Sequence, residues 1–365
     1  MIRSATFPGR YVHGPGALAR LGQEGARLGS HVIVLADANL PADVVNAIGR
    51  DGVEVTVRHV PPSCTPAAVE AARAAAVESG ADVVAGMGGG KVIDLARAAA
   101  DDLNLPFICL PTIAASDAPC SALSVIYDED GHVLHDRFVR FNPRAVIVDS
   151  AVIARAPARL FAAGIGDALA TFYEADACFR AGAKNFSSGR QTRLAMAVAA
   201  TCRDTILELG ATALEACRKG EPNEAFEAVL EANILLSGIG FESGGVAAAH
   251  AIHHGLAELP ETHHFLHGEK VAFGVLVELA LNGASDEELK QMADFNRTVG
   301  LPTCLADLGV TDMEAALPAV ITRATRPGEI IYNEPVRITA AFVETAIRRA
   351  DAVGRKVRED LSTQR

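Results

Sequence analysis

The stretch from Ala81 to Asn104, ADVVAGMGGGKVIDLARAAADDLN, decides how this sequence folds. Residues 81–88 form a short apolar run that is typical of a buried strand, and residues 91–104 follow with a helical pattern. Gly88, Gly89 and Gly90 stand between the two. Glycines allow a tight turn, and the following helix offers free N–H groups that can bind a phosphate. The spacing matches neither G-x-G-x-x-G nor the P-loop, and an ordinary glycine-rich turn would have the same pattern.

The same alternation continues on both sides of this stretch. Apolar, β-branched runs predict further strands, and helical patterns separate them; strand followed by helix is typical of a parallel sheet covered on both faces. Residues 122–138 differ, because two apolar runs joined by Asp-Glu-Asp-Gly predict an inserted β-hairpin. The predicted strands are 31–37, 54–60, 106–112 and 145–150, and the helices between them are 41–52 and 66–80.

After about residue 155 the sequence becomes alanine-rich with helical periodicity, for example at 195–219 and 224–241. We therefore expect an α/β domain over residues 1–158 and an all-helical domain over 159–365. Ligands of open α/β sheets bind beyond the carboxyl ends of the strands, which places the site between the two domains. The last stretch, residues 348–365, predicts an exposed charged helix.

Composition excludes several classes of partner. The 365 residues carry a formal net charge of -12, which disfavours nucleic acid and anionic membrane surfaces. No segment approaches the ~20 apolar residues of a membrane span, and the N-terminus lacks the pattern of a signal peptide. The seven cysteines are scattered and never spaced C-x-x-C, so we expect reduced thiols in a cytoplasmic protein.

Histidines carry the strongest chemical signal. Six of the eleven lie between residues 250 and 267. The spacing of three and four residues puts His250, His253 and His254 near one helix face, and a loop then leads to His267 at the next helix. Imidazoles from two successive helices suit a transition metal, and a catalytic zinc takes three protein ligands with one open position. Asp167, which the glycines of GIGD would set at a helix start, is a candidate third ligand. An aspartate that only caps the N-terminus of a helix would show the same pattern.

Two further segments follow predicted strands. Asp37 ends the first one and could accept a hydrogen bond from a ribose hydroxyl, although a turn or cap aspartate would look alike. Its charge should disfavour a 2′-phosphate, so we expect NAD rather than NADP. Residues 111–119, PTIAASDAP, have the small side chains of a pocket floor or of a simple turn.

The combination of these segments resembles the glycerol dehydrogenases of the iron-type alcohol dehydrogenase superfamily, in order over nearly the whole chain. The resemblance implies a dehydroquinate synthase-like fold, a homo-oligomer, and metal-assisted hydride transfer to NAD from glycerol or a small vicinal diol, giving dihydroxyacetone or another hydroxyketone. The segments are Asp37, GGGK at 88–91, PTIAASDAP at 111–119, SALSVIY at 121–127, GIGDALA at 164–170, AAAHAIHHGL at 247–256 and HGEKVAFG at 267–274.

Roles follow from the resemblance residue by residue. Asp167, His250 and His267 match zinc ligands, Asp117 matches an aspartate beside the polyol, and Asp37 matches the acid at the adenosine ribose. Thr171 stands where iron-using relatives have a fourth ligand, a histidine, so zinc is favoured. His254 replaces an expected asparagine, and His253, His263 and His264 would be neighbours of the site. The remaining positions that match NAD contacts are Gly88, Gly89, Gly90, Lys91, Thr112, Ile113, Ala114, Ala115, Ser121, Leu123 and Tyr127.

Three alternatives share parts of this pattern. A lyase of the dehydroquinate synthase kind would use the same fold, NAD and zinc without releasing NADH. A glycerol-phosphate dehydrogenase would belong to the same superfamily. Both need basic residues for a substrate phosphate, and residues 250–275 offer only Lys270. A binding subunit without activity is the third, and intact candidates at all three metal positions oppose it.

Overall fold

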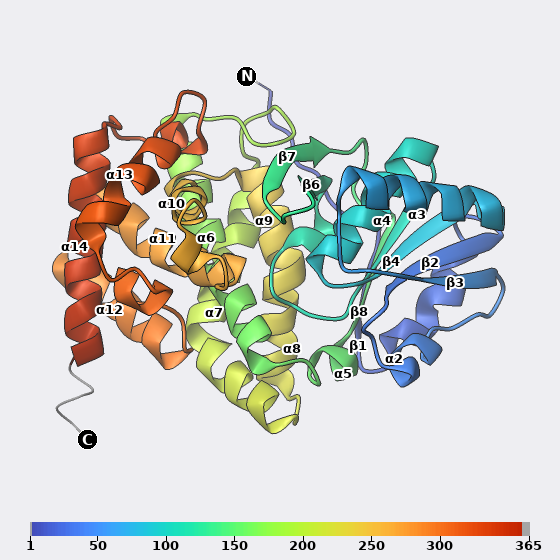
Figure 1. Cartoon of the computed structure of the whole chain (residues 1–365). Helices are drawn as coiled ribbons and strands as arrows, with labels where there is room; N and C mark the ends of the chain where they lie inside the picture. The colour runs from blue at the N-terminus through green and yellow to red at the C-terminus, as the bar shows by residue number, and fades with distance from the viewer. Residues whose placement is uncertain (1, 360–365) are drawn as a thin grey trace.

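The first half of the molecule is a six-stranded sheet with helices on both faces (Figure 1). The computed structural model describes residues 2–359. All the strands are parallel and lie in the order β1-β8-β5-β4-β2-β3. Their bounds are β1 Tyr11–Gly14, β2 His31–Asp37, β3 Glu54–Val60, β4 Val83–Gly88, β5 Phe107–Pro111 and β8 Ala145–Asp149.

The sequence order of the strands reverses in the middle of this sheet. β3 follows β2 in the chain and pairs with one edge of β2, whereas the next strand, β4, pairs with its other edge. The topological switch point therefore lies between β2 and β4. β4, β5 and β8 are buried along their whole length, which explains their continuous apolar runs. One face packs on α3 Pro66–Ser79 and α4 Gly90–Leu103, and the other on α1 Leu21–Gly25 and α2 Ala42–Asn46.

The inserted hairpin is present as predicted. β6 Leu123–Tyr127 pairs antiparallel with β7 Val133–Phe138. Arg97 of α4 fixes it: this buried guanidinium donates to the carbonyls of Ala118 and Leu123 and lies 2.9 Å from Asp94. Asp94 in turn accepts from the Val125 amide at 3.2 Å. A buried charge needs such partners, and here they hold the hairpin to the sheet domain.

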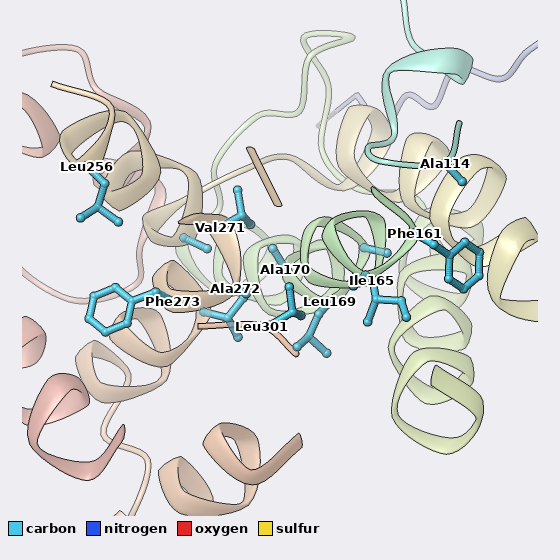
Figure 2. Close-up of a cluster of buried hydrophobic side chains, with 14 of the residues drawn as sticks. Ala114, Phe161, Ile165, Leu169, Ala170, Leu256, Val271, Ala272, Phe273 and Leu301 are labelled. Carbon is cyan, nitrogen blue, oxygen red and sulfur yellow. The ribbon is translucent and has the colours of Figure 1, made fainter. Parts of the chain in front are cut away.

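The second half of the chain is helical. α6 Ala158–Ala181 runs through its middle, packed on α7 Arg193–Lys219 and on α11 His267–Leu281. Figure 2 shows Ile165 and Leu169 of α6 in one cluster with Phe273 of α11 and with Ala114, which comes from the sheet half. The remaining helices are α5 Ser150–Ile153, α8 Glu224–Glu231, α9 Ser237–Gly244, α10 Ala248–Leu256, α12 Asp286–Thr298, α13 Met313–Ala324 and α14 Ala340–Glu359.

Several sequence-based boundaries were wrong. The helix predicted over 41–52 is only α2, and the edge strand β1 was missed because its four residues are too short to show periodicity. The helix predicted over 224–241 is interrupted by a π-helical turn, Ala232–Leu236. The C-terminal helix packs on α11 and α12 and buries Val353 and Val357, so it is not simply exposed; residues 360–365 lie outside the described part. Between residues 2 and 359, no helix combines the length and apolar character needed to span a membrane.

Candidate active site

Three of the predicted ligands meet in the helical half. Asp167, His250 and His267 come from α6, α10 and α11, and their ligand atoms all lie within 4.8 Å of one another. The Asp167 Oδ1 atom lies 2.9 Å from His267 Nε2 and 3.5 Å from His250 Nε2. Asp167 is buried, whereas the His267 side chain is 39% exposed, so the group is reachable from solvent on one side.

Glycines bring these ligands together, though not in the way the sequence predicted. Asp167 lies in the middle of α6, so its prediction at a helix start was wrong. The glycines serve close helix packing instead: a Cβ on Gly268 would lie 1.8 Å from the Ala163 carbonyl oxygen, and one on Gly166 would lie 2.4 Å from the Gly268 oxygen. The two helices therefore touch backbone to backbone beside Asp167 and His267.

The two imidazoles beside Asp167 favour the negative, deprotonated form of its carboxyl group. Burial alone would raise the pKa of Asp167, but the charges of His267 and His250 and their hydrogen bonds outweigh it and hold that pKa well below its usual value. Burial would likewise lower the pKa of His250, yet Glu174 and Asp167 raise it well above the ordinary value. Two imidazoles and one buried carboxylate therefore lie close enough together to share one cation.

The other histidines of the cluster have different partners. His253 Nε2 lies 3.1 Å from His267 Nδ1, on the side of the ring away from Asp167. His254 Nδ1 pairs with Glu329 at 3.1 Å, and His263 Nε2 lies 3.1 Å from the Ala257 carbonyl oxygen. The ring of His264 packs against Phe265. Of these four histidines, His253 forms a hydrogen-bond contact with one of the three candidate ligands, and the role of the others as neighbours of the site stays a prediction.

Asp117 connects the sheet half to the ligand group. Its backbone amide donates to Asp167 Oδ2 at 3.1 Å, and its Oδ2 accepts from the Ser237 hydroxyl at 3.1 Å. Ser237 also lies 2.9 Å from the hydroxyl of Thr171. Burial and the negative charge of Asp167 raise the pKa of Asp117 well above its usual value. A carboxyl group with a raised pKa therefore lies beside Asp167, one of the three candidate ligands.

The predicted nucleotide residues lie largely at the switch point of the sheet. Asp37 ends β2 and Gly88 ends β4, and a Cβ on Gly88 would lie 3.1 Å from the Asp37 Cβ. Gly90 begins α4, and a Cβ there would meet nothing within 4 Å. The Thr112 amide donates to the Gly88 carbonyl oxygen at 3.1 Å, which joins the next strand end to the glycine turn. The arrangement is an open helix N-terminus between two strand ends.

The remaining positions predicted to contact NAD lie in the hairpin and in the segment between β5 and β6. The Lys91 ammonium group lies 4.8 Å from the centre of the Tyr127 ring, so the glycine turn and β6 face each other. Ile113 contacts the Gly89 position, and Ala115 and Leu123 are half-buried nearby in the chain. Ser121 differs, because its buried hydroxyl donates to the Ala118 carbonyl oxygen at 3.3 Å.

Sequence analysis missed three buried polar residues that support the site. Glu174 contacts His250 Nδ1 at 2.6 Å, Ser237 contacts Asp117, and Asn233 donates to the Ala114 carbonyl oxygen at 3.5 Å from the π-helical turn. A signal for Glu174 was available: it lies seven residues after Asp167, on the same face of a helix. Ser237 and Asn233 had no comparable signal, because their partners lie in distant parts of the chain, Asp117 for Ser237 and Ala114 for Asn233.

Comparison with known proteins gives concordant results. Residues 8–150 match the family model described as iron-containing alcohol dehydrogenase. The chain is 44% identical to glycerol dehydrogenase of Pseudomonas putida, over 97% of this chain and 98% of the relative. It is 39% identical to glycolaldehyde reductase of Halobacterium salinarum, over 96% and 98%. The crystal structure of a probable glycerol dehydrogenase from Sinorhizobium meliloti 1021 superposes with a TM-score of 0.92 at 40% identity, covering 98% of this chain and all of that one.

The fold and these matches define an oxidoreductase class. The chain belongs to the iron-containing alcohol dehydrogenase family. Within that family it groups with the glycerol dehydrogenases, which it matches at full length.

Proposed function

We propose that this protein catalyses the NAD-dependent oxidation of glycerol, and of small vicinal diols, to dihydroxyacetone and related hydroxyketones. The observation that carries the proposal is the cluster of Asp167, His250 and His267. Asp117, which belongs to the sheet half that holds the glycine turn, contacts this cluster at Asp167. The glycerol dehydrogenase relatives support the choice of substrate. The glycolaldehyde reductase relative points to a two-carbon substrate as the alternative to examine.

We propose zinc as the metal, with Asp167, His250 and His267 as its ligands. One carboxylate and two imidazoles fit a catalytic zinc, which takes three protein ligands and leaves one position open. Thr171, four residues after Asp167, is buried with its hydroxyl directed to Ser237 and offers no imidazole. A site of three ligands with nitrogen donors favours zinc over a more highly coordinated ion.

Each part of the site has a separate task in this reaction. Zinc, when bound, acts as a Lewis acid that lowers the pKa of the hydroxyl to be oxidised, and NAD accepts the hydride. Asp117 accepts a hydrogen bond from the polyol and holds the proton released in the oxidation, at the carboxyl group that Ser237 orients. Burial and the charge of Asp167 raise the pKa of Asp117 above its usual value, which favours the protonated form of this carboxyl group.

The glycine turn and Asp37 would bind the nucleotide. The open N-terminus of α4 at Gly90 can accept the pyrophosphate on free N–H groups. Asp37, at the end of β2, would accept from the ribose hydroxyls and repel a 2′-phosphate. The contacts proposed for Lys91, Thr112 to Ala115, Leu123 and Tyr127 complete one side of this space, and the inward hydroxyl of Ser121 leaves its backbone as the part that could contact NAD.

The wider organisation also remains our proposal. We divide the chain into a nucleotide-binding domain over residues 1–158 and a metal-binding domain over 159–365, of which 360–365 lie outside the described residues. The apolar cluster that includes both Ala114 and Phe161 joins the two domains. We propose that the protein works as a homo-oligomer, as the resemblance to its family implies, and in the cytoplasm, as its scattered cysteines suggest.

Among the residues that the structure describes, the basic side chains at α11 do not favour the two alternative reactions. Lys270 is buried in α11, and Arg159, which reaches the same helix, lies 2.6 Å from Glu269. A phosphate-bearing substrate requires positive groups that are free to bind it.

Rates of NADH formation test the proposal. Purified protein with NAD should produce NADH from glycerol and 1,2-propanediol, more slowly from ethylene glycol, and not above background from glycerol 3-phosphate. The reverse reaction should consume NADH faster with dihydroxyacetone than with glycolaldehyde. A preference for glycolaldehyde would move the assignment to the two-carbon substrate, and no NADH from any diol would favour the lyase.

A further inference from the structure

One face of α6 carries polar side chains through an otherwise apolar core. Asp167, Thr171 and Glu174 are spaced by four and three residues, so they lie in a row on the helix, and all are at most 3% exposed. Burial of a polar or charged group is costly unless it is hydrogen-bonded. Asp167 and Thr171 have the partners described above. Glu174, the third member, is not part of the proposed ligand set and needs its own explanation.

Glu174 binds one histidine in two ways. Its Oε2 atom accepts from His250 Nδ1 at 2.6 Å. Its Oε1 atom accepts from the backbone amide of the same residue, His250, at 2.9 Å, and from the Ala247 amide at 2.9 Å. These two amides lie at the N-terminus of α10, where backbone N–H groups have no partner within the helix. A single carboxylate thus fixes the position of the helix end and the rotation of the ring.

The contact also selects which ring nitrogen is available. Because Nδ1 donates its hydrogen to Glu174, the lone pair of the neutral ring is on Nε2, the atom that lies 3.5 Å from Asp167 Oδ1. A carboxylate in this place also makes the imidazole a stronger ligand. His267 is supported differently, since its Nδ1 faces the ring of His253.

We propose that Glu174 is a positioning residue for metal binding, which holds His250 Nε2 toward the metal and increases the affinity of the site for zinc. This inference rests on the proposed function, because it assumes that Asp167, His250 and His267 bind the metal. It adds a residue from outside that ligand set. The effect is on affinity and ligand geometry, and Glu174 itself contacts neither metal nor substrate.

The same helix end provides a matched control. Glu278 of α11 is also buried, and its Oε2 atom accepts from the Ala249 amide at 3.2 Å, while Glu334 accepts from the Ala248 amide at 3.1 Å. Glu278 therefore supports α10 without a hydrogen bond to a histidine ring. Burial and the charges of Glu334 and Glu174 raise the pKa of Glu278 well above its usual value. The neutral amide of Glu278→Gln resembles the protonated acid, so this variant tests helix support alone.

The experiment measures zinc affinity by competition with a chromogenic chelator, using metal-depleted full-length protein. In Glu174→Gln, the amide NH2 group must face either the His250 ring or the amides of His250 and Ala247, all of which are donors. We therefore expect the zinc Kd of this variant to rise by about 10- to 100-fold. Glu174→Asp keeps the charge but is too short to reach both the ring and the amides, and should give a smaller rise. Glu278→Gln should stay within about twofold of the unmodified protein. Cobalt-substituted protein gives a second readout, because its visible spectrum should change in the Glu174 variants only.

The outcomes separate this inference from the proposed function. If the unmodified protein does not bind one zinc per chain, or still binds it after His267→Ala, the proposed metal site is wrong and the role of Glu174 falls with it. If that site binds zinc normally and Glu174→Gln binds as tightly, the inference alone is overturned. An equal loss in Glu278→Gln would also overturn it, because general support of α10 would then account for the effect. Should Glu174→Gln fail to fold, the same comparison is made with Glu174→Asp.

Discussion

The two halves of the molecule contribute to the site with different kinds of groups. The sheet half offers backbone at a glycine turn and an open helix end, with Gly90 facing free space. The helical half offers buried ionisable side chains, among them Asp167 and Glu174, which both contact the ring of His250. A substitution that abolishes metal binding should therefore leave nucleotide binding intact, and a substitution that weakens nucleotide binding should leave metal binding intact.

The largest effect is expected from the metal side. His267→Ala removes a ligand, and because metal stabilisation of the developing charge contributes several kcal/mol, kcat should fall by about a thousandfold or more. NAD binding, measured by fluorescence titration, should change by less than about twofold, since the sheet half is untouched. His263→Ala, which changes a histidine outside the ligand group, is the control. Unchanged activity in His267→Ala would remove the metal assignment.

A smaller effect is expected at Asp37. Asp37→Ser removes the charge that opposes a 2′-phosphate, so the preference for NAD over NADP should shrink by about tenfold to a hundredfold. The measurement is the ratio of kcat/KM for the two cofactors. Zinc content should stay the same, because Asp37 lies in the sheet half. Equal use of NAD and NADP by the unmodified protein would contradict this reading.

Gly90→Ala tests the open helix end without disturbing the fold. The added methyl group would meet no protein atom within 4 Å, so the melting temperature should stay within about a degree. It would obstruct a bound pyrophosphate, and crowding of this kind costs roughly 1–3 kcal/mol, so the NAD Kd should rise by about tenfold. Gly131→Ala, in the hairpin turn, is a poor control because alanine would be strained at the positive φ of 88° found there. Zinc affinity is therefore the better control, and it should be unchanged.

The smallest effect concerns stability and pH in the helical half. Burial raises the pKa of Glu334 to about 7, and burial together with the charges of Glu334 and Glu174 raises the pKa of its partner Glu278 well above its usual value. A carboxyl group with a raised pKa in the folded state binds more protons than in the unfolded chain, so stability falls as pH rises from about 4.5 toward 7. Melting curves should show a decrease of a few degrees over that range. In Glu278→Gln the decrease should be smaller; a steeper one would contradict the assignment.

The sheet half could be predicted well because its signals are local. The alternating patterns gave β2, β3, β4, β5 and β8 within two residues and the hairpin as a unit. Strand β1 was missed, since four residues are too few to show a period. Local spacing could not give the order of the strands, which depends on pairings between distant segments.

The helical half shows the opposite balance. The histidine cluster was visible, but its spacing left the choice of ligands open, and the residues came from the family resemblance. The structure explains why: Asp167 and His267 meet because glycines let α6 and α11 touch, a contact between positions a hundred residues apart. Glu174 escaped notice because a glutamate in a helix is usually exposed, and its burial depends on the packing of α10.

The most direct test of the central claim is NADH formation from glycerol before and after chelation, with NAD binding measured on the same samples. If the two halves hold metal and nucleotide separately, chelation abolishes NADH formation, zinc restores it, and NAD binds throughout with nearly constant affinity. Activity that survives complete removal of the metal would contradict the account. So would a loss of NAD binding together with the metal, because the two halves would then form one inseparable site.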